Sequence, residues 1–202
     1  MIYQSHRVSR GSLCSLVAAV LFTWSANAYA CACCADSGVW QETGAKVSGK
    51  DFDAFKDFKF SATARLIAPN GDDEVKGIGR VADYSYKLAL VPSPQRWSLE
   101  FTDSRGAKGK LFLIPLTTTS FATDLFDGSE KGGLGPRLYK EWRFEGQVGA
   151  DSLFAQGITN DAKFRLIIQG RGNLCPNPED FKHWKLQVAG QRAQYTFYGA
   201  LQ

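Results

Sequence analysis

Apolar and polar residues alternate with a period of two over most of the chain. In residues 96–102, for example, Trp97, Leu99 and Phe101 alternate with polar or charged neighbours. This alternation is typical of β-strands that bury one face. The clearest other strands predicted from it are 58–66, 162–170 and 192–201. Helical periodicity is almost absent, and we predict only a single helical turn, within the acidic and aromatic segment 51–58.

Turn-forming residues separate these strands. Asn, Gly, Pro and Asp cluster in the loops predicted at 69–74, 104–110, 127–136 and 175–180. Glycines inside strands, at Gly146, Gly170 and Gly199, are suited to tight bends in a curved sheet. The pattern predicts an all-β fold with one antiparallel β-barrel of about 8–10 strands, in which neighbours along the chain pair. The alternative is a two-sheet β-sandwich.

The first 30 residues have the features of a bacterial secretory leader. Arg7 and Arg10 precede the short apolar run 13–24, and Ala28 and Ala30 lie where signal peptidase prefers small residues. We therefore predict that residues 1–30 are a signal peptide and that 31–202 form a single barrel domain. The protein is then expected in the periplasm or outside the cell.

The charge balance argues against a dedicated nucleic-acid binder. Arg7 and Arg10 are the only charged residues before Cys31, so removal of the leader lowers Lys+Arg from 24 to 22, against 20 acidic residues. A nucleic-acid footprint needs a concentrated basic surface. Here the basic residues are interspersed with acidic ones, and we expect no nucleic-acid partner.

A short motif near the predicted mature N-terminus resembles a known family signature. Gly38-Val39-Trp40 is similar to the G-x-W motif of lipocalins and the wider calycin group, and Thr123-Asp124-Leu125 matches part of their second signature. The resemblance implies a calycin-like barrel in which Trp40 packs across the closed end, with Arg192 as its basic partner. It also implies that the protein holds a small apolar molecule.

Cysteines cluster just after the predicted cleavage point. Cys14 leaves with the leader, and four remain: Cys31, Cys33, Cys34 and Cys175. An even number in an exported chain favours disulfides. A bond between the adjacent Cys33 and Cys34 needs an awkward ring, so we predict that Cys175 pairs with one member of the cluster at 31–34.

Metal binding is the alternative use of these thiols. Cys31, Cys33, Cys34 and Cys175, with His183 as a further ligand, are suited to Cu(I) or Zn(II), which accept soft sulfur ligands. The C-x-C-C spacing departs from that of zinc modules. The compartment that receives an exported protein is also oxidising, which favours disulfides over free thiols. We therefore expect no cofactor, and predict His183 to be a strand residue opposite the face of Trp184, Leu186 and Val188.

Lipid attachment is a third reading of the cluster. If Cys31 is the first mature residue, acylation of Cys31 makes the protein an outer-membrane lipoprotein attached to the membrane through that lipid. Ala28 and Ala30 are more typical of ordinary signal cleavage than of a lipoprotein signal.

Recognisable catalytic motifs are absent from the sequence. It has no nucleophile elbow, zinc-protease helix, phosphate loop or dinucleotide fingerprint, and His183 is the one histidine after the leader. These features favour a binding protein over an enzyme. We expect an exported barrel that binds a small apolar ligand or serves as an accessory protein of the cell envelope. The alternatives are a thiol-based copper or zinc protein and a structural envelope lipoprotein.

Overall fold

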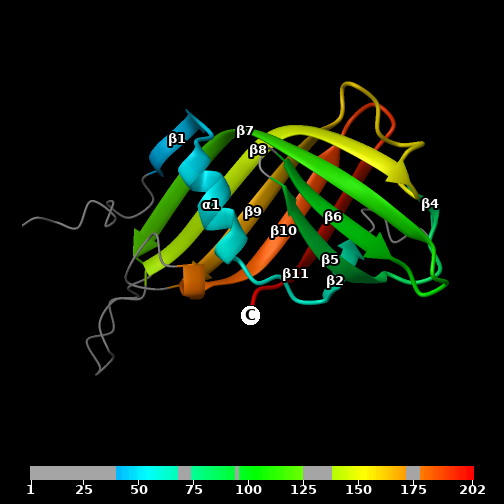
Figure 1. Cartoon of the computed structure of the whole chain (residues 1–202), viewed down its shortest axis with the longest axis horizontal. Coiled ribbons are helices and arrows are strands. Elements are labelled where there is room, and N and C mark those ends of the chain that lie inside the picture. Colours follow the sequence, from blue (N-terminus) through cyan, green and yellow to red (C-terminus); the bar gives the residue numbers. More distant parts are fainter. Residues whose placement is uncertain (1–39, 68–73, 94–95, 125–137, 172–177) are drawn as a thin grey trace, which may run out of the picture. The chain divides into compact units, whose positions relative to one another are not determined.

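The computed structural model describes residues 40–67, 74–93, 96–124, 138–171 and 178–202. All of them belong to the unit Cys33–Gln202. Eight antiparallel strands of this unit form a closed β-barrel (Figure 1), which confirms the predicted fold class. The barrel strands are β2 (Thr63–Ile67), β5 (Ser85–Ser93), β6 (Arg96–Thr102), β7 (Lys108–Asp124), β8 (Leu138–Ser152), β9 (Lys163–Arg171), β10 (Phe181–Ala189) and β11 (Gln194–Ala200).

The barrel has the up-and-down connectivity that the loop spacing predicted. Each barrel strand pairs with the next one along the chain, and β11 closes the barrel by pairing with β2, where Thr196 faces Ile67. Two short strands lie between β2 and β5 in the chain, β3 (Glu74–Val75) and β4 (Gly79–Arg80). They form a separate two-stranded sheet. A further strand, β1 (Trp40–Lys46), lies outside the closed ring and pairs with β7 from Thr117 to Phe121.

Strands β7 and β8 are longer than the others and bend sharply together. Their pairing shifts register between Pro115 and Thr117, opposite Gly146. A Cβ atom on Gly146 would lie 2.0 Å from the carbonyl oxygen of Ile114, so only glycine fits there. The sequence predicted a tight bend at Gly146, and the structure shows why glycine is required there: the two strand backbones approach each other closely at the bend.

Aromatic and aliphatic side chains fill the interior of the barrel. The predicted inward face of β6 is correct, because Trp97, Leu99 and Phe101 are all buried. From other elements, the fully buried aromatic side chains are Phe55, Phe144, Phe154, Trp184, Tyr195 and Phe197. These residues form one continuous hydrophobic cluster.

A helix, α1 (Gly49–Asp57), covers one end of the barrel (Figure 1). The sequence-based prediction of one helical turn was too short, and the strand expected to begin at Phe58 begins at Thr63. The backbone between them makes only an isolated bridge, from Phe60 to Leu201. Phe52 and Phe55 are three residues apart, so a helix places both side chains against the barrel, which a strand would not do.

A short 3-10 helix, Pro178–Asp180, leads into β10. Over the described ranges, no helix has both the length and the apolar character needed to cross a bilayer.

Candidate functional site: the barrel mouth beneath α1

The end of the barrel beneath α1 is lined almost entirely by aromatic rings. We call this region the barrel mouth, and its members are Phe52, Phe55, Phe58, Phe60, Trp97 and Trp184. Phe55 lies at its centre and is fully buried. Its ring stacks on Trp97 of β6, with ring centroids 3.6 Å apart and planes inclined by 12°. Phe144 of β8 meets Phe55 edge-on, at 6.4 Å.

Trp184 of β10 forms the opposite side of the barrel mouth. Phe60 lies between Phe55 and Trp184, since its ring centroid is 5.5 Å from each of theirs. The Trp184 indole also packs flat on the backbone of Gly199 in β11, where an added Cβ would lie 2.7 Å from Nε1. Glycine at this position therefore fixes the depth of Trp184 in the barrel mouth.

Two indole N–H groups of the barrel mouth have no hydrogen-bond partner among the described residues. They are Nε1 of Trp97 and Nε1 of Trp184, and both side chains are about 1% exposed. Trp142, a neighbour on β8, shows the usual arrangement, because its Nε1 donates to Thr118 Oγ1 at 2.5 Å. A buried donor without a partner costs roughly 1–3 kcal/mol, so native proteins seldom leave one without a reason.

Backbone hydrogen bonds tether α1 to the barrel at both of its ends. The Val47 N–H donates to the carbonyl of Leu116 at 3.1 Å, and the Ser61 N–H donates to the carbonyl of Ala200 at 3.0 Å. Between these tethers, the polar side-chain contacts that the structure describes for α1 stay local. Asp51 accepts from the N–H and the hydroxyl of Ser48, both at 2.7 Å, and Lys56 pairs with Asp53. Aromatic contacts thus hold the helix against the barrel.

A cleft of about 420 Å³ runs beside the C-terminal end of α1. Its lining includes Lys56, Phe58, Lys59, Glu179 and Gln202. Phe58 is therefore both a member of the barrel mouth and a wall of this cleft.

A buried ion pair lies next to the same end of the barrel. Lys140 of β8 is only about 1% exposed, and its Nζ lies 2.8 Å from Asp180 Oδ2. The ammonium group also lies 4.8 Å from the ring centroid of Phe181, which in turn meets Phe58 edge-on. This pair ties the 3-10 helix before β10 to the rim of the barrel mouth.

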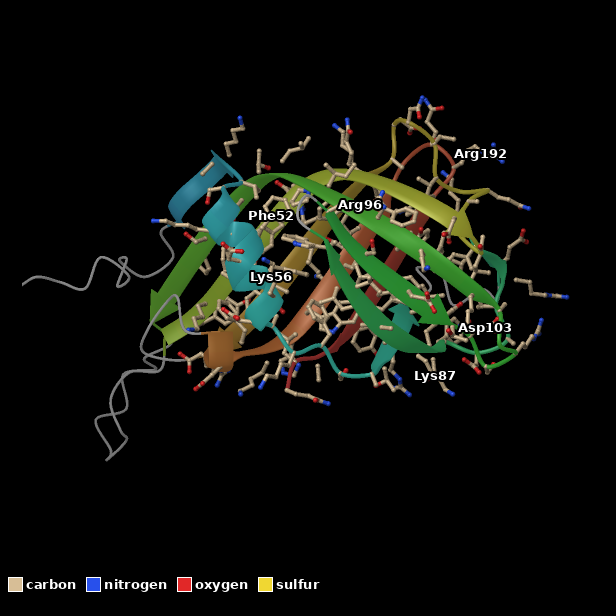
Figure 2. The ribbon with its side chains drawn as sticks, in the orientation of Figure 1. Phe52, Lys56, Lys87, Arg96, Asp103 and Arg192 are labelled. Carbon is tan, nitrogen blue, oxygen red and sulfur yellow. The ribbon has the colours of Figure 1, made fainter. Side chains whose placement is uncertain are left out.

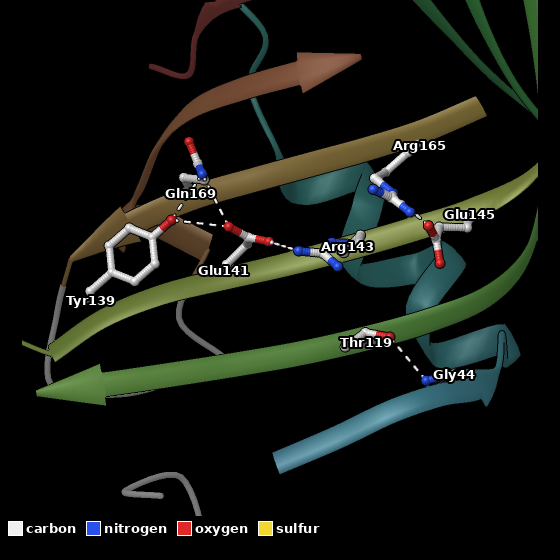
Figure 3. A network of polar contacts seen from close by, with 8 residues as sticks. All are labelled: Gly44, Thr119, Tyr139, Glu141, Arg143, Glu145, Arg165 and Gln169. Carbon is white, nitrogen blue, oxygen red and sulfur yellow. Dashed lines mark hydrogen bonds and ion pairs between the residues drawn. The ribbon is translucent and has the colours of Figure 1, made fainter. Parts of the chain in front are cut away.

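The outer face of β8 and β9 carries a different kind of surface, a network of polar side chains (Figure 3). Glu141 accepts hydrogen bonds from Tyr139 at 3.0 Å and Gln169 at 3.1 Å, and pairs with Arg143 at 2.7 Å. Burial of the phenol and the neighbouring Glu141 carboxylate raise the pKa of Tyr139 to about 12. Tyr139 therefore remains a neutral donor at physiological pH, and the network is a structural clasp between the two strands.

A groove of about 790 Å³ lies on this outer face, at the bend near Gly146. Leu116, Glu145 and Arg165 are among the residues that line it. Arg165 and Glu145 form an ion pair, with 2.5 Å between Nε and Oε1, which is drawn in Figure 3. The groove is larger than the cleft beside α1. Its Arg165 and Glu145 pair with each other, however, whereas the barrel mouth contains buried donors that lack a partner among the described residues.

The cysteine-based predictions concern residues outside the described part of the chain. Cys31, Cys33, Cys34 and Cys175 all fall there, so the predicted disulfide, the copper or zinc site and the lipid anchor stay predictions. His183 is described, and it is exposed on β10, while Trp184, Leu186 and Val188 are buried. It thus lies on the outward face that the alternation predicted.

The structure does not bring together the two residues that the lipocalin resemblance had paired. Trp40 pairs with Phe121 at the far end of β7, and the strand register continues from there to Gln169 and His183. Arg192 is exposed in the turn between β10 and β11, at the other end of those strands, as Figure 2 shows. The row of Trp40 ends at His183, next to Trp184, so the backbone of Trp40 lies at the end of the barrel that α1 covers, and packing of its side chain across that end stays a prediction.

No family model, curated protein or solved structure matches this chain. The eight-stranded barrel agrees with the calycin-like architecture that the sequence resemblance implied. Membership of that group remains a prediction that rests on the short motif at Gly38-Val39-Trp40.

Proposed function

We propose that the protein is an exported envelope protein that binds a small, mainly apolar molecule at the barrel mouth. The observation that carries this proposal is the pair of buried indole donors, Trp97 Nε1 and Trp184 Nε1, which lack partners in an otherwise apolar site. Small-molecule sites typically combine apolar walls with a few convergent polar groups. The barrel mouth has this composition, and the leader-like first 30 residues support export.

Binding of an apolar fluorescent probe tests the proposal. The full chain, with its own leader, is expressed, and the protein is purified in the form that the cell produces from it. It is then titrated with N-phenyl-1-naphthylamine, decanoate, fluorene and 9-fluorenone. We expect saturable binding of at least one probe with a stoichiometry of one. Organic extraction of the purified protein followed by mass spectrometry gives an independent search for a co-purified molecule.

The matched control is a substitution on the outer groove. Leu116→Ser removes an apolar side chain that is 50% exposed and lines the outer groove, and it keeps the backbone carbonyl that accepts from Val47. We expect this variant to bind every probe as the wild type does. Loss of binding in Leu116→Ser would place the site on the outer face, and absence of saturable binding of all four probes would refute the proposed function.

A further inference from the structure

Basic residues are concentrated on one half of the barrel wall. The neighbouring strands β5, β2, β11, β10 and β9, which pair in this order, contain seven Lys and Arg residues and no Asp or Glu. The other three barrel strands, β6, β7 and β8, contain five basic and five acidic residues. The two signs are interspersed along the chain, but the fold separates them. We call the outer side of the five strands the basic face, and its charged residues are Arg65, Lys87, Lys163, Arg165, Arg171, Lys182 and Lys185.

We infer that the basic face is a docking surface for a membrane that contains anionic phospholipids. The inference goes beyond the proposed function, because it concerns the outer wall of the barrel and needs no ligand at the barrel mouth. Without residues 1–30 the chain carries 22 basic and 20 acidic residues. An anionic surface therefore attracts the protein through the distribution of its charges and not through its net charge.

Most charges of the basic face are available to an outside partner. Arg165 pairs with Glu145 of the neighbouring strand β8, and the other six basic residues make no ion pair with any residue that the structure describes. Five of these six are exposed, and Lys185 is half-buried. On β7, by contrast, Lys108 lies 3.4 Å from Glu100. Each Lys or Arg close to an anionic membrane surface strengthens binding about fivefold, so several of them together suffice for docking.

The middle strand of the basic face, β11, has no charged residue and presents an exposed aromatic ring. Tyr198 is 38% exposed, and its partners on the two neighbouring strands are Lys185 and Arg65. Ile67, which is 43% exposed, lies two residues beyond Arg65 on β2. A tyrosine and an aliphatic side chain between basic residues are typical of a membrane-interface contact, in which the ring enters the headgroup region and the cations meet the phosphates.

The shape of the basic face favours a flat partner. The outer wall of a closed barrel is convex, so a flat surface meets five neighbouring strands along one narrow strip at their middle. Tyr198 and Ile67 lie on this strip, and long basic side chains on both sides extend toward the receding surface. A small anion needs a concave site instead. Neither the groove near Gly146 nor the cleft beside α1 includes Tyr198, Arg65 or Lys185 in its lining.

The aromatic content of this face favours lipid over single-stranded nucleic acid. Sites for single strands stack successive bases on several aromatic rings. Among the described residues of the five strands, Tyr198 is the one exposed aromatic side chain, since Tyr86, Tyr195 and Phe197 are all buried. One ring offers a single stacking position, which is sufficient for an interfacial anchor and insufficient for a base-stacking platform.

Vesicle co-sedimentation tests the charge dependence. The purified product of the full chain is incubated with vesicles of phosphatidylcholine alone or with about one-third phosphatidylglycerol. We expect binding to the anionic vesicles to be tighter by at least about tenfold, and high salt to abolish the difference by screening exposed charges. A lipid on Cys31 would hold the protein on both kinds of vesicle, so the comparison uses Cys31→Ser if the intact mass shows acylation. Equal binding to both kinds of vesicle would overturn the inference.

Charge variants locate the surface. Arg65→Gln combined with Lys185→Gln should weaken binding to the anionic vesicles by about 10- to 30-fold. Lys50→Gln combined with Lys108→Gln is the matched control, because it makes the same change in net charge at two exposed residues outside the basic face. The control should weaken binding by less than about threefold. Similar losses in the two double variants would show that net charge alone is responsible and would overturn the inference.

Apolar variants test the contact strip. Tyr198→Ser combined with Ile67→Ser should weaken binding by about 5- to 20-fold and leave the preference for anionic vesicles intact, because the basic residues remain. The matched control is Ile114→Ser combined with Leu116→Ser, which removes two apolar side chains of β7 that are 41% and 50% exposed. We expect this control to bind as the wild type does. Equal binding by the two double variants would contradict a contact at Tyr198.

Lysine acetylation maps the contact on the wild-type protein and keeps the test informative if a variant does not fold. On addition of anionic vesicles, Lys185 should be protected, while Lys50 and Lys108 should react as before. Protection of Lys50 and Lys108 without protection of Lys185 would overturn the inference. So would binding of heparin or of a single-stranded oligonucleotide together with no binding of phosphatidylglycerol vesicles. Apolar probes are titrated without vesicles, so the proposed function and this inference stand or fall separately.

Discussion

Trp97 and Trp142 pack against the same ring, Phe144, and differ in one hydrogen bond. Trp142 donates to Thr118, whereas Trp97 donates to no described residue. A protein under selection for stability alone would fill the Trp97 position with an apolar ring. A buried donor without a described partner costs roughly 1–3 kcal/mol, so the two tryptophans are expected to respond differently when the donor is removed.

Stability measurements on two matched variants test this difference. Trp97→Phe and Trp142→Phe remove the same atoms, but only the second breaks a hydrogen bond and leaves Thr118, which is 6% exposed, without that partner. We predict that Trp97→Phe has the higher free energy of unfolding of the two, by about 1–3 kcal/mol. Urea denaturation measures both values, and equal losses would contradict the account.

At the scale of elements, the bend of β7 and β8 depends on the absence of a side chain at one position. Gly146 lies opposite the register shift in β7, where a Cβ would lie 2.0 Å from a backbone oxygen that cannot move cheaply. Gly149, three residues further along β8, lies where a Cβ would be 3.7 Å from Phe112, an ordinary contact distance.

The two glycines therefore predict opposite outcomes for the same substitution. Gly146→Ala should lower the free energy of unfolding by more than about 2 kcal/mol, because the strands must separate to admit the methyl group. Gly149→Ala should change it by less than about 1 kcal/mol. Thermal denaturation of both variants checks the prediction, and a tolerated Gly146→Ala would show that the bend is not a close approach.

The strands of this barrel were largely predictable from the sequence, and the barrel mouth was not. Alternation located β6, β9 and β11 to within a residue or two, because each buries one face along its whole length. It failed at 58–62, where Phe58 and Phe60 are apolar at strand spacing but pack against α1 and the barrel mouth.

The unpartnered donors had no sequence signal at all. Alternation indicated that Trp97 and Trp184 point inward, but the presence of a partner depends on which side chains surround each indole in three dimensions. The spacing of Phe52 and Phe55 was the available signal for α1, since residues three apart share a helix face.

At the scale of the whole molecule, buried tyrosines make stability depend on alkaline pH. Burial raises the pKa of Tyr86 to about 12, and burial together with Glu141 raises that of Tyr139 to about 12. Burial also raises the pKa of Tyr195. In the unfolded chain these phenols ionise near pH 10. The folded state thus holds its protons more tightly than the unfolded state above that pH.

We predict that the free energy of unfolding is constant below pH 10 as far as these groups are concerned and falls as pH rises from 10 to 12. The slope is at most about 1.4 kcal/mol per pH unit for each tyrosine that stays protonated. Tyr139→Phe lacks one of the titrating groups and should show a shallower slope. Denaturant titrations at several pH values measure the slopes, and identical slopes would contradict a raised pKa at Tyr139.

The predicted disulfide also belongs to this scale, because it links distant parts of the chain. The strand register runs from Trp40 in β1 across β7 and β8 to Gln169 in β9, a span of about 14 Å. Cys34 precedes Trp40 by six residues and Cys175 follows Gln169 by six. Six residues reach up to about 20 Å when extended, so a bond from Cys175 to the cluster at 31–34 is within reach.

We predict that Cys175 is oxidised to Cys31, Cys33 or Cys34 in protein purified from the exporting cell. Non-reducing peptide mapping should recover the crosslinked pair, and Cys175→Ser should lower the free energy of unfolding by about 2–5 kcal/mol. Four free thiols together with stoichiometric copper or zinc would favour the metal site instead.

The closure of the barrel through β2 and β11 has a consequence for the order of folding. The seam joins residues 65–67 to 196–198, so it forms only after the rest of the barrel has brought the two strands together. Local hairpins such as that of β5 and β6 close short loops and form early, whereas this pairing carries the highest entropic cost of any in the barrel. Folding is therefore expected on the millisecond-to-second timescale of all-β domains. Until the seam forms, the edges of β2 and β11 are unpaired, and the chain passes through a stage that is open to mispairing with its neighbours.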